Sequence, residues 1–246
     1  MAIYHIIIEY DGTNFVGWQK QKNGPSIQEE IQKVLNKILK EKINLYGSGR
    51  TDSGVHAIAQ SAHFIIKKKI INKHQFLNTI NFFLNKKKIS ILDIKKKNQS
   101  FHARHNAKKR IYKYIIENRI APLSLDINKA WHLKSTLNIK LMKKAAKILQ
   151  GTKDFSTYRS SSCGATSPIR TLEHVNIKKN NNKIIITFSS RSFLQQQVRS
   201  MVGCLKKVGE EKWSIKKFKF TMDSKKRINC APPAPPCGLY LLKVFY

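Results

Sequence analysis

The stretch "SIQEEIQKVLNKILK", residues 26–40, has the pattern of a single amphipathic helix. Ser26 followed by Glu29 is a capping box, a common start of a helix. Six apolar residues recur every three or four positions and form one stripe: Ile27, Ile31, Val34, Leu35, Ile38 and Leu39. Because only one face of this helix is apolar, that face must pack on another element. We therefore predict a helix that covers one side of a sheet.

Strand patterns lie on both sides of this helix. Residues 3–10, "IYHIIIEY", read as a buried strand that ends at the turn "DGT". After the helix, the pattern predicts short strands near 43–47 and 60–66, a helix around 72–84 and a strand around 88–94. This β-α-β-β-α-β succession is typical of a ferredoxin-like unit.

The rest of the chain has a looser version of the same succession. It begins with the strand "RIYKYIIE" at 110–117 and ends with the strand "LYLLKVFY". Between them we predict a helix near 138–150, strands near 172–178 and 183–189, and a helix from about 193 to 208. "APPAPP", residues 231–236, is expected to be a stiff extended connector. The prediction is an α+β protein with two ferredoxin-like halves, residues 1–105 and 106–246, with mostly antiparallel sheets that meet at a cleft.

Positive charge dominates the composition. The 246 residues include 47 Lys and Arg against 14 Asp and Glu, which gives a formal net charge of +33. No fold requires such a charge, but a polyanionic partner would use it, and nucleic acid is the leading candidate. The alternative is a compositional bias that raises Lys, Asn and Ile together, with many lysines only solvating the surface. The chain has no apolar run of membrane-spanning length and no leader pattern at its start, so we expect a soluble, unexported protein without membrane contact.

The motif "GSGRTDSGVHA", residues 47–57, places one carboxylate, Asp52, among glycines. In an extended segment Arg50 would project to the same side and keep Asp52 ionised, as a nucleophile or general base must be. The alternative is an aspartate that caps its own turn. The spacing is not that of a phosphate-binding loop, and no ligand cluster for a metal accompanies Asp52. His56 is expected to pack, and the four cysteines to be reduced, non-catalytic thiols.

Six blocks along the chain resemble, in this order, the tRNA pseudouridine synthase A family. They are "YDGTNFVGWQKQ" (10–21), "GSGRTDSGVHA" (47–57), "FHARHNAKKRIYKYII" (101–116), "GTKDFSTYR" (151–159), "QVRSMVG" (197–203) and "GLYL" (238–241). The second block is highly specific, and the resemblance spans nearly the whole chain.

The resemblance implies a pseudouridine synthase fold with a basic RNA-binding cleft. It implies a cytoplasmic isomerase that converts uridine to pseudouridine at positions 38, 39 and 40 in the anticodon stem-loop of tRNAs. The family uses no metal and no organic cofactor, and it is homodimeric. Its motif aspartate is catalytic, which gives that role to Asp52. The glycosidic bond breaks, the base turns, and C5 rejoins C1′.

Three more residues match motif positions that bind the substrate. Arg50 matches an arginine that addresses the RNA, Tyr112 the tyrosine that stacks on the target base, and Arg199 the arginine that pairs with the catalytic aspartate. From the pattern alone, Arg199 borders an apolar stripe and would be an ordinary snorkelling arginine, so its functional role rests on the motif. Tyr114 is expected to pack in the core and Trp18 beneath the active region. Phe101, His102 and Arg104 are assigned to RNA contact or to structure with equal weight.

The sequence departs from the family next to Arg199. Residues Gln195, Gln196 and Gln197 stand where histidines are common, and Ser200 stands where asparagine is usual. Because the arginine itself is retained, these departures bear on the neighbouring RNA contacts and not on catalysis. Two other readings remain: an RNA-binding protein that chaperones tRNA without catalysis, and a ribonuclease. The first has no use for Asp52, and the second lacks the expected histidine pairs or clustered carboxylates.

Overall fold

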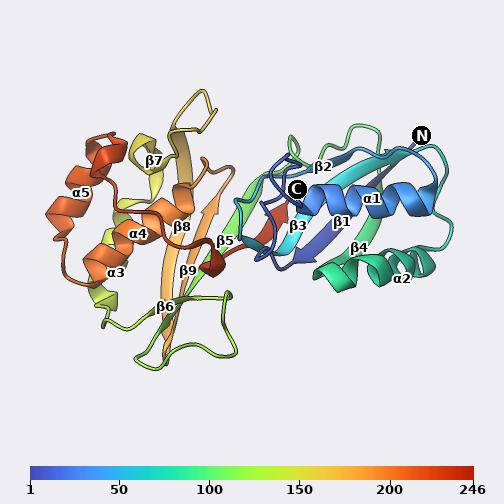
Figure 1. Ribbon diagram of the computed structural model, residues 1–246. Coiled ribbons are helices and arrows are strands. Elements are labelled where there is room, and N and C mark those ends of the chain that lie inside the picture. The colour runs from blue at the N-terminus through green and yellow to red at the C-terminus, as the bar shows by residue number, and fades with distance from the viewer. The chain divides into compact units, whose positions relative to one another are not determined.

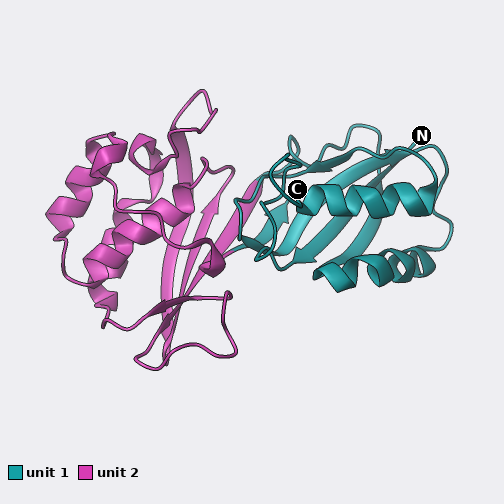
Figure 2. Cartoon of the chain, in the orientation of Figure 1, with its two compact units in different colours: residues 1–108, 240–246 teal, residues 109–239 magenta.

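The computed structural model describes residues 1–246, which form two compact units (Figure 2). Unit 1 contains residues 1–108 together with 240–246, and unit 2 contains residues 109–239. The end of the chain therefore returns to the unit in which the chain began. Both units combine helices with mostly antiparallel strands, so the predicted α+β class is confirmed.

Unit 1 is built on one sheet whose strand order is β4-β1-β3-β10. Its strands are β1 (Ala2–Tyr10), β2 (Leu45–Gly47), β3 (His56–Ile66), β4 (Ile89–Lys97) and β10 (Leu239–Phe245). The pairs of β1 with β3 and with β4 are antiparallel, the short β2 adds to β3, and β10 runs parallel to β3. Figure 1 shows α1 (Ile27–Leu39) and α2 (Lys73–Leu84) side by side along this sheet.

The first helix forms as its sequence predicts. The Ser26 side chain accepts a hydrogen bond from the Glu29 amide at 3.3 Å, and Ile27, Ile31 and Leu35 are fully buried. In a full capping box the Glu29 side chain would also accept a hydrogen bond from the Ser26 amide. Here the Glu29 carboxylate instead lies 3.4 Å from the Lys33 ammonium group. One cap and one buried stripe are enough to fix the helix on unit 1.

Unit 2 has the strand order β5-β9-β8-β7, with all of these pairs antiparallel. Its strands are β5 (Lys109–Asn118), β6 (Trp131–Leu133), β7 (Gly151–Asp154), β8 (Ile169–Asn180) and β9 (Lys183–Ser190), and β6 pairs parallel with β5. Its helices are α3 (Ile139–Ile148), α4 (Gln197–Gly209) and α5 (Ile215–Asp223). None of the helices in either unit has the length and apolarity needed to cross a membrane.

Helix α4 begins later than the sequence predicts. The pattern placed its start near residue 193, but Gln196 has a left-handed backbone with φ of 61°, which interrupts a helix. The Gln197 side-chain oxygen accepts a hydrogen bond from the Leu194 amide at 2.8 Å, so this glutamine shapes the turn that leads into α4. The earlier start was wrong because an apolar stripe does not reveal a left-handed residue before it.

Candidate functional site

The Asp52 loop, residues 48–55, connects β2 to β3 in unit 1. Its first half is fixed by Gln60, a fully buried residue of β3. The Gln60 amide donates to the Gly49 carbonyl at 3.0 Å, and its oxygen accepts from the Ser48 hydroxyl at 2.8 Å. Sequence reasoning missed Gln60, although an amide at the start of the predicted strand "QSAHFII" is a signal that a buried polar group needs partners.

The second half of the loop is held by the segment between β1 and α1. The Trp18 amide donates to the Thr51 carbonyl at 3.1 Å, and the Thr51 hydroxyl lies 2.8 Å from the Tyr10 hydroxyl. On the other side of Asp52, the Ser53 hydroxyl donates to the Phe15 carbonyl at 3.1 Å. Both neighbours of the half-buried Asp52 are therefore anchored, which fixes where its carboxylate is presented.

Two glycines allow the two segments to approach this closely. A Cβ atom on Gly17 would lie 2.6 Å from the Thr51 carbonyl oxygen, and φ at Gly17 is +112°. A Cβ atom on Gly47 would lie 2.5 Å from the indole nitrogen of Trp18, which is buried beneath the loop as expected. A side chain at either position would push the loop away from its support.

The turn that contains Asp52 has a main-chain hydrogen bond and a glycine. It is closed by the backbone, because the Val55 amide donates to the Asp52 main-chain carbonyl at 3.2 Å. Gly54 supplies the positive φ, 74°, that such a turn takes at its third residue. Main-chain groups therefore close this turn, and the side chain of Asp52 projects from it.

Arg50 does not pair with Asp52. Its side chain is exposed, and its Nε donates to the Gln19 side-chain oxygen at 3.1 Å, while no ion pair joins it to Asp52. Gln19 belongs to the first motif block and Arg50 to the second. Two motifs that are distant in sequence therefore meet here, with a guanidinium group at the surface of unit 1.

His56, at the start of β3, packs as expected. It is 1% exposed, and its ring stacks on Tyr240 with centroids 4.7 Å apart. Its Nδ1 lies 3.1 Å from both the Gly12 amide and an Asp11 carboxylate oxygen. This histidine therefore joins the turn "DGT" to the Asp52 loop.

In unit 2, Tyr112 lies on β5 opposite Phe188 of β9. It is 8% exposed, and its ring packs edge to face against Phe193 with centroids 5.1 Å apart. Arg110, on the same face, donates from its guanidinium to the Arg191 carbonyl. Tyr114 is fully buried, its hydroxyl donates to the Pro235 carbonyl at 2.7 Å, and burial raises its pKa. The expectation of a core role for Tyr114 is confirmed.

Arg199, near the start of α4, is tied to the segment 231–235. Its Nε donates to the Ala234 carbonyl at 2.8 Å, and the Ala234 amide donates back to the Arg199 carbonyl at 2.9 Å. One turn further along α4, a Cβ atom on Gly203 would lie 2.1 Å from the Pro232 carbonyl oxygen. The proline-rich segment thus lies directly on α4 and orients the half-buried side chain of Arg199.

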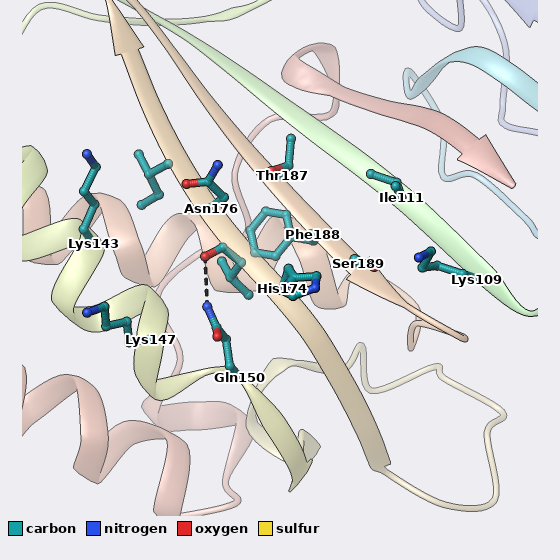
Figure 3. A pocket seen from close by; sticks show the side chains of 12 residues that line it. Lys109, Ile111, Lys143, Lys147, Gln150, His174, Asn176, Thr187, Phe188 and Ser189 are labelled. Carbon is teal, nitrogen blue, oxygen red and sulfur yellow. Dashed lines mark hydrogen bonds between the residues drawn. The ribbon is translucent and has the colours of Figure 1, made fainter. Parts of the chain in front are cut away.

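The four site residues divide evenly between the units: Arg50 and Asp52 lie in unit 1, and Tyr112 and Arg199 in unit 2. Unit 2 also has a depression of about 620 Å³ that contains none of them (Figure 3). Lys143 and Lys147 of α3 line it, and the Gln150 amide reaches the Val175 carbonyl at 3.1 Å across it. This depression is therefore separate from the residues that the motifs single out.

Comparisons with known proteins match this chain over nearly its whole length. The family model described as tRNA pseudouridine synthase matches residues 6–121 and 145–246. A protein of Pelagibacter ubique named tRNA pseudouridine synthase A is 61% identical over the full length of both chains. Proteins of the same name from Neorickettsia sennetsu and Maricaulis maris are 44% and 41% identical, over 99% and 100% of this chain and 99% and 98% of theirs.

These matches and the α+β fold define the class of protein, an enzyme that isomerises a nucleoside within RNA. The chain belongs to the tRNA pseudouridine synthase family.

Proposed function

We propose that this protein converts uridine to pseudouridine at positions 38, 39 and 40 in the anticodon stem-loop of tRNAs, with Asp52 as the catalytic carboxylate. The observation that carries the proposal is the Asp52 loop itself. Both neighbours of Asp52 are anchored, and a main-chain hydrogen bond closes the turn. The loop therefore presents the Asp52 carboxylate at a fixed position, as a catalytic group requires. In a chain of charge +33, it is also a group that RNA phosphates would disfavour.

The reaction exchanges one bond to the ribose for another. The bond between N1 and C1′ breaks, the uracil turns, C5 bonds to C1′, and the hydrogen on C5 is lost to water. Asp52 would supply the carboxylate that assists bond cleavage, by attack on the sugar, addition to the base or removal of a sugar proton. No metal or organic cofactor is part of the proposed reaction.

A uridine within a stem is stacked and paired, so it must leave the helix before it reacts. We assign the exposed Arg50 to the RNA, where its guanidinium would contact phosphate or occupy the vacated position. The ring of Tyr112 would stack on the extruded base, and Arg199 would pair with Asp52 while it acts. In this assignment unit 1 supplies the catalytic loop and unit 2 the groups that hold the base, which was the expected division of labour between the two halves.

Family membership also supports a tRNA partner. The partner is tRNA, and lysines that meet its phosphates would supply affinity without reading bases. We further propose that the protein acts as a homodimer in the cytoplasm. Sedimentation analysis at micromolar concentration would test the dimer, and a monomer under those conditions would contradict it.

The central test uses unmodified tRNA with tritium at uridine C5. We expect the wild type to release tritium without cutting the RNA, and Asp52→Asn to release none while it still binds tRNA. Asp126→Asn is a matched control, because Asp126 pairs with Lys183 far along the chain in unit 2, and its tritium release should stay at the wild-type level. Tritium retention by the wild type despite tight binding would favour the RNA chaperone, and shortened RNA would favour the ribonuclease.

Tyr112 has its own test, because stacking needs a ring and not a hydroxyl group. Tyr112→Phe should keep most of the tritium-release rate, whereas Tyr112→Leu should lower it by roughly 10- to 100-fold, the equivalent of one stacked base. Circular dichroism should show both variants folded. Equal rates for the Phe and Leu variants would rule out the stacking role.

A further inference from the structure

Unit 2 contains a pair of thiols that no step of the proposed reaction uses. Cys204 lies on α4 and is fully buried, and the half-buried Cys230 follows the short 3-10 helix Arg227–Asn229. Their sulfur atoms are 3.5 Å apart. The other two cysteines are not arranged in this way: the thiol of Cys237 contacts the Ala130 carbonyl, and Cys163 lies in a separate turn.

The surroundings of the two sulfurs differ. The Ala231 amide approaches the Cys204 sulfur at 3.4 Å, and the Arg227 guanidinium lies beside the pair, where it donates to the Ser200 hydroxyl at 2.8 Å. The hydrogen bond from Cys204 and then the positive charge of Arg227 lower the pKa of Cys230, whereas the bond to Cys230 and burial raise the pKa of Cys204. The half-buried Cys230 is more accessible than the fully buried Cys204, so it is placed to react first as a thiolate and Cys204 to respond as the second thiol.

We propose that Cys204 and Cys230 are a redox-active dithiol that a peroxide converts to a disulfide. The Cys230 thiolate attacks hydrogen peroxide, which forms a bond from sulfur to oxygen and releases hydroxide that becomes water. The Cys204 sulfur, losing its proton, then attacks the Cys230 sulfenic sulfur and expels a second water. Two thiols lose two electrons in total, and one peroxide is reduced to two waters.

The disulfide would fasten the segment after Cys230 to α4. A disulfide bond is about 2 Å long, so the sulfurs would have to approach by about 1.5 Å. The same segment already lies on α4 through Gly203 and through the two hydrogen bonds between Arg199 and Ala234. Oxidation would turn this non-covalent attachment into a covalent one, at the place where the Arg199 side chain is oriented.

Peptide mapping of the full-length protein tests this proposal without tRNA, so its outcome is independent of the proposed function. The protein is exposed to hydrogen peroxide, denatured in N-ethylmaleimide, digested and analysed by mass spectrometry. We expect a peptide pair joined through Cys204 and Cys230, with both thiols recovered after dithiothreitol. Cys163 and Cys237 serve as controls within the same chain and should stay alkylated. A pair that stays fully alkylated, or equal linkage to Cys163 or Cys237, would overturn the proposal.

Two variants separate the roles of the two sulfurs. In Cys204→Ser, Cys230 should stop at the sulfenic acid, which dimedone would trap. In Cys230→Ser, dimedone should label neither position. Sulfenic acid on Cys204 in the second variant would reverse the assigned order, and oxidation of wild-type Cys230 to the sulfinic acid without linkage would show that the pair does not act together.

Discussion

The side chain of Asp52 is positioned by its two neighbours and by a residue of the strand below. Thr51 and Ser53 are held on either side of it, and the buried Gln60 holds the loop from the strand below. Such support explains how a polar loop can present one carboxylate in a fixed direction without a salt bridge to Arg50. The geometry of the loop therefore depends on Gln60 as much as on its glycines.

Replacing Gln60 by leucine tests this dependence. Gln60→Leu keeps the size of the side chain but leaves the buried Ser48 hydroxyl and the Gly49 carbonyl without their partner. We expect a loss of about 1–3 kcal/mol in the free energy of unfolding, measured with urea, and slower tritium release. The control is Gln99→Leu, at an exposed residue whose amide reaches only the Met1 carbonyl. If both variants behaved alike, Gln60 would not be a support of the loop.

At the scale of elements, contacts between distant segments determine what the sequence pattern cannot. The helix α1 could be predicted because its cap and its stripe lie within fourteen residues, whereas α5 and β7 were not predicted. The strand β7 is four residues long, and its pairing with β8 rather than its own pattern defines it. The motif order predicted which loops matter, but not that Gln19, Phe15 and Gln60 meet there, because such contacts depend on the fold.

The contact between α4 and segment 231–235 gives a prediction at this scale. A methyl group in Gly203→Ala would meet the Pro232 carbonyl oxygen, so the backbone must shift. We expect a loss of about 1–3 kcal/mol in the free energy of unfolding, together with a lower rate of tritium release because Arg199 is moved. Gly164→Ala is the matched control, since nothing lies within 4 Å of its added methyl group. A thermal melt of Gly203→Ala that coincides with those of the wild type and of Gly164→Ala would contradict the close contact.

Two histidines that face each other across β1 and β3 make unit 1 sensitive to acid. His5 and His63 are directly opposite, and burial lowers the pKa of each from 6.5 to about 4. The unfolded chain then binds more protons, so stability is complete above pH 6.5 and is lost as the pH falls toward 4. At pH 5 each histidine should lower the free energy of unfolding by on the order of 1–2 kcal/mol relative to pH 7. Urea titrations of the wild type and of His63→Gln at both values would measure this, and equal pH dependence in the two proteins would exclude His63 as a cause.

For the whole molecule, the charge of +33 predicts how tRNA binding responds to salt. If about 5 phosphates are neutralised, a fourfold rise in salt should weaken binding on the order of 100-fold. Filter binding with wild type and Asp52→Asn should give the same slope, because Asp52 is not a phosphate contact in the proposed reaction. A slope near zero would mean that the lysines reflect composition and not recognition.

The return of residues 240–246 to unit 1 has a consequence for how the protein is made. A ribosome delivers the chain from its N-terminus, and domains generally fold as they emerge. Yet β3 receives its parallel partner β10, and His56 the ring of Tyr240, only after all of unit 2 has been made. The sheet that carries the Asp52 loop thus stays open along one strand until residues 240–246 have emerged. A chain truncated before residue 240 would retain every candidate catalytic residue and still lack a completed first unit.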